Sequence, residues 1–163
     1  MSYLKTLTAA LILLNSVNLF SQQGWFQLNS GTTNQLNCIS SFGSKVWAVG
    51  NNGTILRTTN GGINWFSQFS GTTNDLNYIC LIFLRDSVAY IVGDAGTILR
   101  STNLGNNWGI VNSGTNADLN AICPLFDTIS VIAVGNGGTI LKSTNRGSSW
   151  VQRTSPVNVN LNN

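Results

Sequence analysis

The ionisable side chains of this 163-residue sequence are few, and their types limit the chemistry it can perform. All five acids are aspartates (Asp75, Asp86, Asp94, Asp118 and Asp127), and the chain has no glutamate and no histidine. Without histidine it has no Ser-His-Asp or Cys-His arrangement. Glycoside hydrolysis needs two facing acids. Three of the aspartates, at 75, 94 and 118, could gather on one face, but each acid stands near an expected turn or strand end, where capping is the simpler role. We therefore expect no enzyme.

The three cysteines match no metal-binding spacing, and we expect neither a metal nor a cofactor. Cys80 and Cys123 each lie ten residues after a serine that opens a repeat, and Cys38 falls two residues earlier in its own repeat. All three are expected on one face of equivalent strands, packed as small apolar residues near the centre of the fold. A disulfide between Cys80 and Cys123 is the alternative in an oxidising compartment.

The cations are scattered, which argues against nucleic-acid binding. Charged residues make up only 8% of the chain and the formal net charge is +3, whereas a nucleic-acid footprint needs a dense basic face. Arg57, Arg100 and Lys142 each follow Thr-Ile-Leu. They are either cross-strand hydrogen-bonding residues or a basic ring that contacts an acidic partner, so we keep them as candidate binding residues.

The first 21 residues are typical of a secretory signal peptide. Lys5 precedes an apolar run from Leu7 to Leu14, which is too short to span a bilayer comfortably. We expect cleavage after Ser21, a mature chain of residues 22–163 without a membrane span, and a secreted or extracytoplasmic location.

A repeat organises the rest of the chain. Gly53–Trp65 returns as Gly96–Trp108 and Gly138–Trp150, at intervals of 43 and 42 residues. Around it, a Trp is followed five residues later by Ser and six later by Leu-Asn, beginning at Trp25, Trp65, Trp108 and Trp150. Such a period indicates supersecondary units that stack to bury an apolar face.

Each unit is expected to hold four short antiparallel strands, the pattern of a β-propeller blade. The expected strands are 36–42, 45–49, 54–58 and 64–69 in the first unit, 76–84, 87–92, 97–101 and 107–111 in the second, and 119–126, 129–134, 139–143 and 149–153 in the third. We predict an all-β propeller or partial propeller with three complete blades, at about 30–69, 70–112 and 113–154, plus end strands and the start of a further repeat at 155–163.

The segment Thr58–Trp65 resembles the Asp-box, or BNR motif, whose pattern is Ser/Thr-x-Asp-x-Gly-x-Thr/Ser-Trp. Two further segments match equally well, and all three carry Asn where the family usually has Asp. The side chain of this Asn can accept from N–H groups of its own turn, Gly permits the bend and Trp packs over the hairpin. The structural residues are therefore Thr58, Asn60, Gly62, Trp65, Ser101, Asn103, Gly105, Trp108, Ser143, Asn145, Gly147 and Trp150.

The longer repeat, with Val-Gly-x-x-Gly-Thr-Ile-Leu before the Asp-box, is similar to the Ycf48-like propeller family, over residues 25–162. That family is named for a photosystem II assembly factor of plants and cyanobacteria. The resemblance implies a non-catalytic scaffold that binds a protein or a glycan, with a role of the photosystem II assembly type among the options. Sialidases also carry Asp-boxes, so the alternative is a truncated sialidase-like or glycoside hydrolase propeller fragment.

Loops on a rigid scaffold usually carry binding. The second-to-third turns and the fourth-to-first connections are expected on the same face, and the candidate binding residues there are Asn52, Asp75, Asp94 and Asp118. Three blades make an awkward propeller, because closed forms use about four to eight. Trp25–Leu28 and Asn160–Asn163 could meet in one partial fourth blade; otherwise self-association or another chain covers the open edges, or the frame is part of a longer array.

Overall fold

The computed structural model describes residues 27–82, 87–125, 127 and 129–162. The expected signal peptide and Trp25 lie outside the described residues. Within the described ranges, no helix is long and apolar enough to cross a bilayer.

The chain forms three antiparallel sheets of four strands each, in the order in which the strands occur in the sequence. The first sheet holds β1 (Leu36–Phe42), β2 (Lys45–Gly50), β3 (Thr54–Thr58) and β4 (Phe66–Gln68). The second holds β5 (Leu76–Ile82), β6 (Val88–Gly93), β7 (Ile98–Ser101) and β8 (Gly109–Val111). The third holds β9 (Leu119–Pro124), β10 (Val131–Gly135), β11 (Ile140–Ser143) and β12 (Val151–Arg153). A single 3₁₀ turn, η1 (Asn136–Gly138), joins β10 to β11. The predicted all-β architecture is confirmed, and we call these sheets blades 1, 2 and 3.

The outermost strands are shorter than the sequence predicted. They were expected to include the Asp-box Trp, but β4, β8 and β12 begin only after Trp65, Trp108 and Trp150. The reason lies in the turn, where the N–H group of the residue just before the Trp bonds to the Asn side chain instead of joining the ladder.

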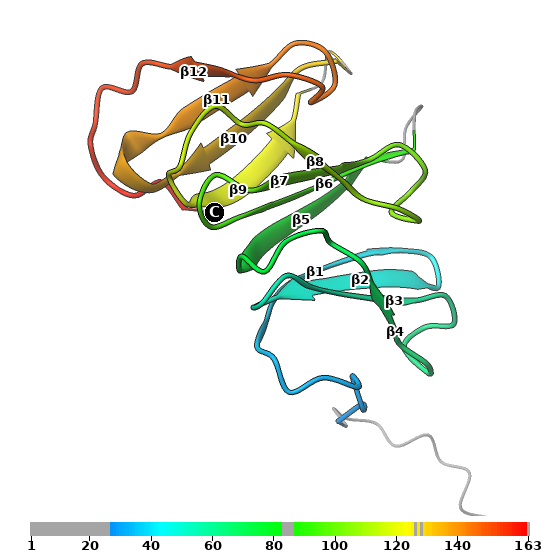
Figure 1. Cartoon of the computed structure of the whole chain (residues 1–163). Coiled ribbons are helices and arrows are strands. Elements are labelled where there is room, and N and C mark those ends of the chain that lie inside the picture. Colours follow the sequence, from blue (N-terminus) through cyan, green and yellow to red (C-terminus); the bar gives the residue numbers. More distant parts are fainter. Residues whose placement is uncertain (1–26, 83–86, 126, 128, 163) are drawn as a thin grey trace, which may run out of the picture.

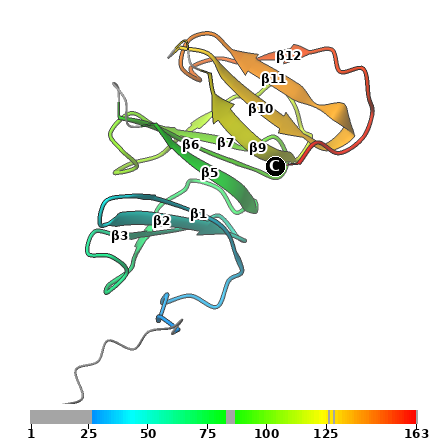
Figure 2. The same ribbon diagram turned by 180° about the vertical axis from the view of Figure 1, so that it is seen from behind.

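The blades stack in a row with blade 2 in the middle (Figures 1 and 2). One apolar cluster lies between blades 1 and 2 and includes Trp47, Val49, Leu76 and Ile91. A second cluster between blades 2 and 3 is built in the same way, from Tyr90, Val92, Leu119 and Ala133 among others. Because side chains alternate along a strand, each blade presents one apolar face to each neighbour.

The row is open, and its two ends lie apart. Leu28 lies beside the Asp-box turn of blade 1, close to Gly62. Leu161 instead bonds to Gly135 of blade 3, at the other end of the row (Figure 1). The expectation that Trp25–Leu28 and Asn160–Asn163 could share one blade is therefore wrong for the described part of these segments, because they lie at opposite ends of the open row.

Candidate interaction surfaces

The three Asp-box turns are self-contained hydrogen-bonded units. In blade 2, the buried Ser101 hydroxyl donates to Asn103 Oδ1 (2.9 Å) and accepts from the N–H of Gly105 (2.9 Å). Asn103 Oδ1 also accepts from the N–H of Asn107 (3.0 Å). Thr58 with Asn60 and Ser143 with Asn145 repeat this network. The amide oxygen thus makes the bonds that a carboxylate oxygen makes in the usual motif.

The glycine of each turn lies against an aromatic or apolar side chain that precedes it in the row. Trp47 of β2, fully buried, donates from Nε1 to the carbonyl of Gly105 (3.0 Å). Tyr90 of β6 packs under Gly147 in the same way, and any side chain there would collide with its ring. Both glycines have φ near 70° (65° and 71°). Sequence analysis did not single out Trp47 and Tyr90, although each stands three residues before the Gly that ends its strand.

Two of the three repeated cations lie between blades. Arg57 stacks on the ring of Trp47, 5.1 Å from its centroid. Arg100 donates from Nε to the carbonyl of Arg146 in the Asp-box turn of blade 3 (2.7 Å). Lys142 has the same register position on β11, on the face of blade 3 that no further blade covers in the described part. The contacts of Arg57 and Arg100 favour a structural role over a basic ring.

The loop face holds the candidate aspartates, and each is engaged by its neighbours. Asp75 and Asp118 accept from the N–H groups of Asn52 (2.9 Å) and Ala95 (3.0 Å), which lie on the preceding blade. Asp94 accepts from the side chain of Asn77 (2.8 Å). The second-to-third turns and the fourth-to-first connections do lie side by side, and Asn52 lies exposed among them. Asp75 and Asp118 therefore join neighbouring blades, whereas Asp94 is held within blade 2.

The cysteines are separate thiols that differ in exposure. Cys38 and Cys80 are half-buried against the two apolar clusters, whereas Cys123 is exposed. Burial, followed by the electrostatic effect of the other two thiols, raises the pKa of Cys80 from 9.0 to about 11. The packing expected near the centre is wrong for Cys123, because the face of blade 3 on which it lies has no covering blade. The alternative disulfide between Cys80 and Cys123 is not formed.

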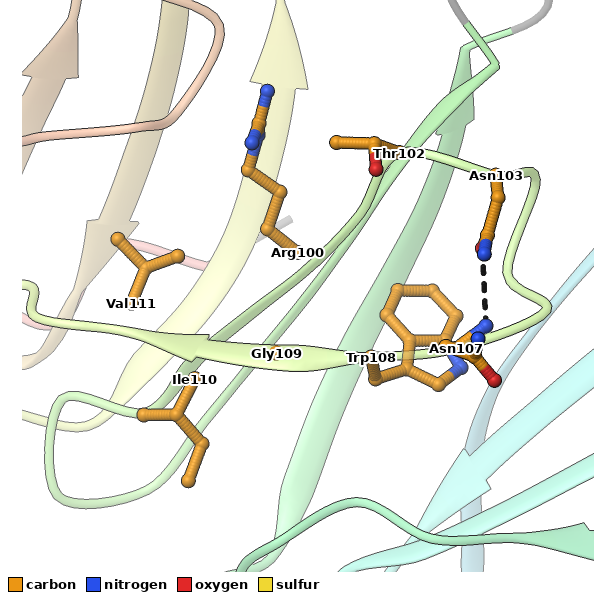
Figure 3. A pocket seen from close by; sticks show the side chains of 8 residues that line it. All are labelled: Arg100, Thr102, Asn103, Asn107, Trp108, Gly109, Ile110 and Val111. Carbon is orange, nitrogen blue, oxygen red and sulfur yellow. Dashed lines mark hydrogen bonds between the residues drawn. The ribbon is translucent and has the colours of Figure 1, made fainter.

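Two hollows adjoin the outer edge of blade 2. The first runs along β7 and β8 and is lined by Arg100, Thr102, Asn103, Asn107, Trp108, Gly109, Ile110 and Val111. Figure 3 shows that Val111 and Ile110 project to opposite sides of β8. The second hollow opens between the loops, where Thr72, Asn74, Ala95, Ile110 and Asn116 are among its walls, and its lining carries no charged side chain.

Exposed apolar side chains stand beside the second hollow. Phe69 is 88% exposed and Ile110 is 61% exposed. A methyl group placed on Gly71 would lie 3.4 Å from Ile110 Cδ1 and 3.7 Å from Phe69 Cε1, so both side chains close over this glycine. Sequence analysis missed them, since Phe69 falls at the end of an expected strand and nothing in its spacing marks an exposed aromatic. The described residues contain no group of three or more His, Cys, Asp or Glu side chains that could hold a metal ion.

Comparison with known proteins places these blades in a family. The family model described as "Photosynthesis system II assembly factor YCF48" matches residues 7–102, more than half of the chain. The chain belongs to the Ycf48 family. A search of curated proteins by sequence gives no match.

Solved Ycf48 structures share this fold. The structure of YCF48 from Cyanidioschyzon merolae has a TM-score of 0.68 and 21% identity, and the match covers 81% of this chain and 44% of that one. YCF48 bound to a D1 peptide gives a TM-score of 0.64 at 21% identity, covering 81% and 43%. An ancestral GH74 enzyme gives 0.65 at 17% identity, covering 76% and 19%. The chain thus spans less than half the length of the Ycf48 structures it matches.

Proposed function

We propose that this Ycf48-family chain is a secreted, non-catalytic module that binds an extended segment of a partner protein. The observation that carries the proposal is the uncharged hollow between the loops, next to exposed Phe69 and Ile110. Amide groups of Asn74 and Asn116 supply donors and acceptors there, while Ile110 supplies an apolar wall. This combination suits a polypeptide backbone with an apolar side chain.

The choice of a protein partner over a glycan is supported by the relative solved with a D1 peptide. A role in assembling a membrane protein complex, of the photosystem II type, is supported by the same comparison and by the matching family model. Secretion is supported by the leader of residues 1–21, whose removal would leave Gln22 first.

The non-catalytic part of the proposal rests on the aspartates. Asp75 and Asp118 each accept a hydrogen bond from a turn of the preceding blade, and Asp94 accepts one from Asn77 of its own blade. A general acid or a nucleophile must be free to reach its substrate. Carboxylates held in these hydrogen bonds lack that freedom, so these three aspartates supply no pair of acids for the glycosidase alternative.

The test is a titration of the chain with a fluorescent D1 peptide, followed by anisotropy, with a scrambled peptide as a control. Ile110→Asn and Phe69→Ser should each weaken binding about tenfold, because losing the burial of one large apolar side chain removes ~1.5 kcal/mol. Phe66→Ser is the matched control, since Phe66 is also an exposed phenylalanine of blade 1 (58%) but, unlike Phe69 and Ile110, it neither lines the hollow nor provides the atoms nearest to Gly71.

Saturable binding that only the first two variants weaken supports the proposal. Equal affinity for the scrambled peptide, or equal effects of all three substitutions, contradicts binding at this hollow. Absence of any peptide binding, together with capture on a glycan array, would replace the protein partner by a glycan.

A further inference from the structure

The outer face of blade 1 carries the residues that are buried between the other blades. Leu36 and Ile39 of β1 hold the register positions of Leu76 and Ile79 on β5, opposite equivalent positions of the second strand. Leu76 and Ile79 are 0% and 2% exposed, whereas Leu36 and Ile39 are 39% and 64% exposed. Blade 1 therefore exposes on this side apolar residues whose equivalents in blade 2 are covered by a neighbouring blade.

The outer face of blade 3 is the complementary half of the same contact. Val134 and Ile140 are half-buried, while their equivalents in blade 2, Val92 and Ile98, are fully buried against the next blade. Ile132 stands where Trp47 and Tyr90 stand in the other blades. The outer face of blade 1 thus corresponds to the face with which blade 2 packs against the blade before it. The outer face of blade 3 corresponds to the face with which blade 2 packs against the blade after it.

The rim of blade 3's open face is already occupied by residues 155–161 of the same chain. Asn120 Nδ2 donates to the carbonyl of Leu161 (3.0 Å), as Asn37 does to Leu76 (3.0 Å) and Asn77 to Leu119 (3.1 Å). Gly138 donates its N–H to Val159 (2.7 Å), as Gly53 does to Asn74 (2.9 Å). This tail therefore makes the contacts that the entry segment of a following blade makes at the other two boundaries.

Residues 30–36 of blade 1 share the spacing of that tail. Ser30 precedes Leu36-Asn37 by the same interval at which Ser155 precedes Leu161-Asn162, and the Ser30 and Ser155 hydroxyls each donate to a carbonyl two residues on. A segment with the same spacing and the same local turn can form the same bonds. The tail and the entry segment of blade 1 are thus interchangeable at this site.

We propose that two copies of this chain associate head to tail, blade 3 of one against blade 1 of the other, and that the tail of residues 155–161 competes with this contact. The occupant is a second copy because the interface continues one that the chain already makes twice, between blades 1 and 2 and between blades 2 and 3. Such a contact is heterologous, and two of them close a ring of six blades, within the range of closed propellers.

The electrostatics of the contact are compatible with it. Lys142 has the position of Arg100, whose Nε bonds to the carbonyl of Arg146 in the next Asp-box turn. In the assembly Lys142 would face the equivalent carbonyl, that of Gly61 in the second copy. Leu28 of the second copy, which lies over Gly62 as Gln68 lies over the turn of blade 2, must move aside for β12 of the first copy.

The experiment is sedimentation equilibrium of the full chain and of a variant that lacks residues 155–163. We expect the full chain to dimerise weakly and the shortened chain at least tenfold more tightly, because the competing tail is gone. Ile39→Asp should abolish association in either form, whereas Phe66→Ser on the outer rim should leave it unchanged. A full chain that stays monomeric at the highest concentration reached, or an Ile39→Asp variant that still associates, overturns the proposal.

Mixing two single-face variants tests the head-to-tail geometry. Ile39→Asp and Val134→Asp should each be monomeric, and a 1:1 mixture should form a dimer through the two intact faces. An isologous contact cannot give this rescue, so a mixture that stays monomeric overturns the geometry. If the shortened chain fails to fold, as judged by circular dichroism, the same substitutions in the full chain decide the outcome. None of these measurements involves the peptide, so this proposal and the proposed function can fail independently.

Discussion

Identical residues at equivalent positions experience different surroundings in this chain, and the thiols of Cys80 and Cys123 illustrate it. Both lie opposite the residue of the second strand that faces the next blade. Cys80 is covered by blade 3 and packs against its apolar cluster, while Cys123 lies exposed. Burial disfavours a thiolate, which is why the pKa of Cys80 rises to about 11.

This shift predicts an alkaline loss of stability. The folded chain holds the Cys80 proton up to about pH 11, whereas the unfolded thiol loses it near pH 9.0. The stabilisation is complete below pH 9 and is lost as the pH rises to 11, by at most about 2–3 kcal/mol for this partly buried thiol. Tyr90, whose pKa burial also raises, acts in the same direction at higher pH.

Urea unfolding in reducing buffer from pH 8 to 11 measures the effect. Cys80→Ala should flatten the decline in the free energy of unfolding, and Cys123→Ala, the matched control, should keep it. Parallel pH profiles for the two variants would show that the Cys80 thiol is not the group responsible.

At the scale of the element, one side chain of the outermost strand is polar at one boundary between blades and apolar at the other. At the boundary of blades 1 and 2, Gln68 of β4 donates to the carbonyls of Gly105 (2.9 Å) and Asn106 (3.0 Å) and accepts from Trp108 Nε1 (3.3 Å). At the boundary of blades 2 and 3, Val111 has the place of Gln68. Trp150 Nε1, the equivalent of the Trp108 donor, is buried without a partner in the described part of the chain.

Exchanging these two residues should therefore have opposite effects. Gln68→Val leaves the indole N–H of Trp108 and the carbonyl of Asn106 without their side-chain partner, while the carbonyl of Gly105 keeps its bond to Trp47, and should lower the free energy of unfolding by ~1–3 kcal/mol. Val111→Gln supplies an acceptor for Trp150 and should raise it by ~0.5–1 kcal/mol. Chemical denaturation of both variants beside the parent chain measures this. Destabilisation of similar size by both would mean that the Gln contacts are not transferable between boundaries.

At the scale of the whole molecule, the open row makes blade 2 different from its neighbours. Blade 2 is packed on both faces, and every residue of β6 is buried. Blades 1 and 3 each have one face that no blade covers among the described residues. In a stack of this kind, stability depends on the number of neighbouring units.

Hydrogen exchange should follow this arrangement. In a chain kept monomeric by Ile39→Asp, the amides of β6 and β7 should exchange more slowly than those of β2 and β3 or of β10 and β11, because opening blade 2 breaks two interfaces. Mass spectrometry of peptic fragments resolves the three blades. Equal protection of all three would indicate that the row opens only as a single cooperative unit.

The sequence by itself determined the strands, the turns and the repeat, because each Asp-box network is local: Ser101, Asn103 and Gly105 satisfy one another within five residues. The tertiary structure alone decided what happens between repeats. It placed Trp47 and Tyr90 under the turns of the next blade, hydrogen-bonded Asp75 and Asp118 to turns of the preceding blade, and left Cys123 exposed. These outcomes depend on contacts between residues some 20 to 60 positions apart, and a repeat that reads the same in every copy cannot show which copy lacks a neighbour.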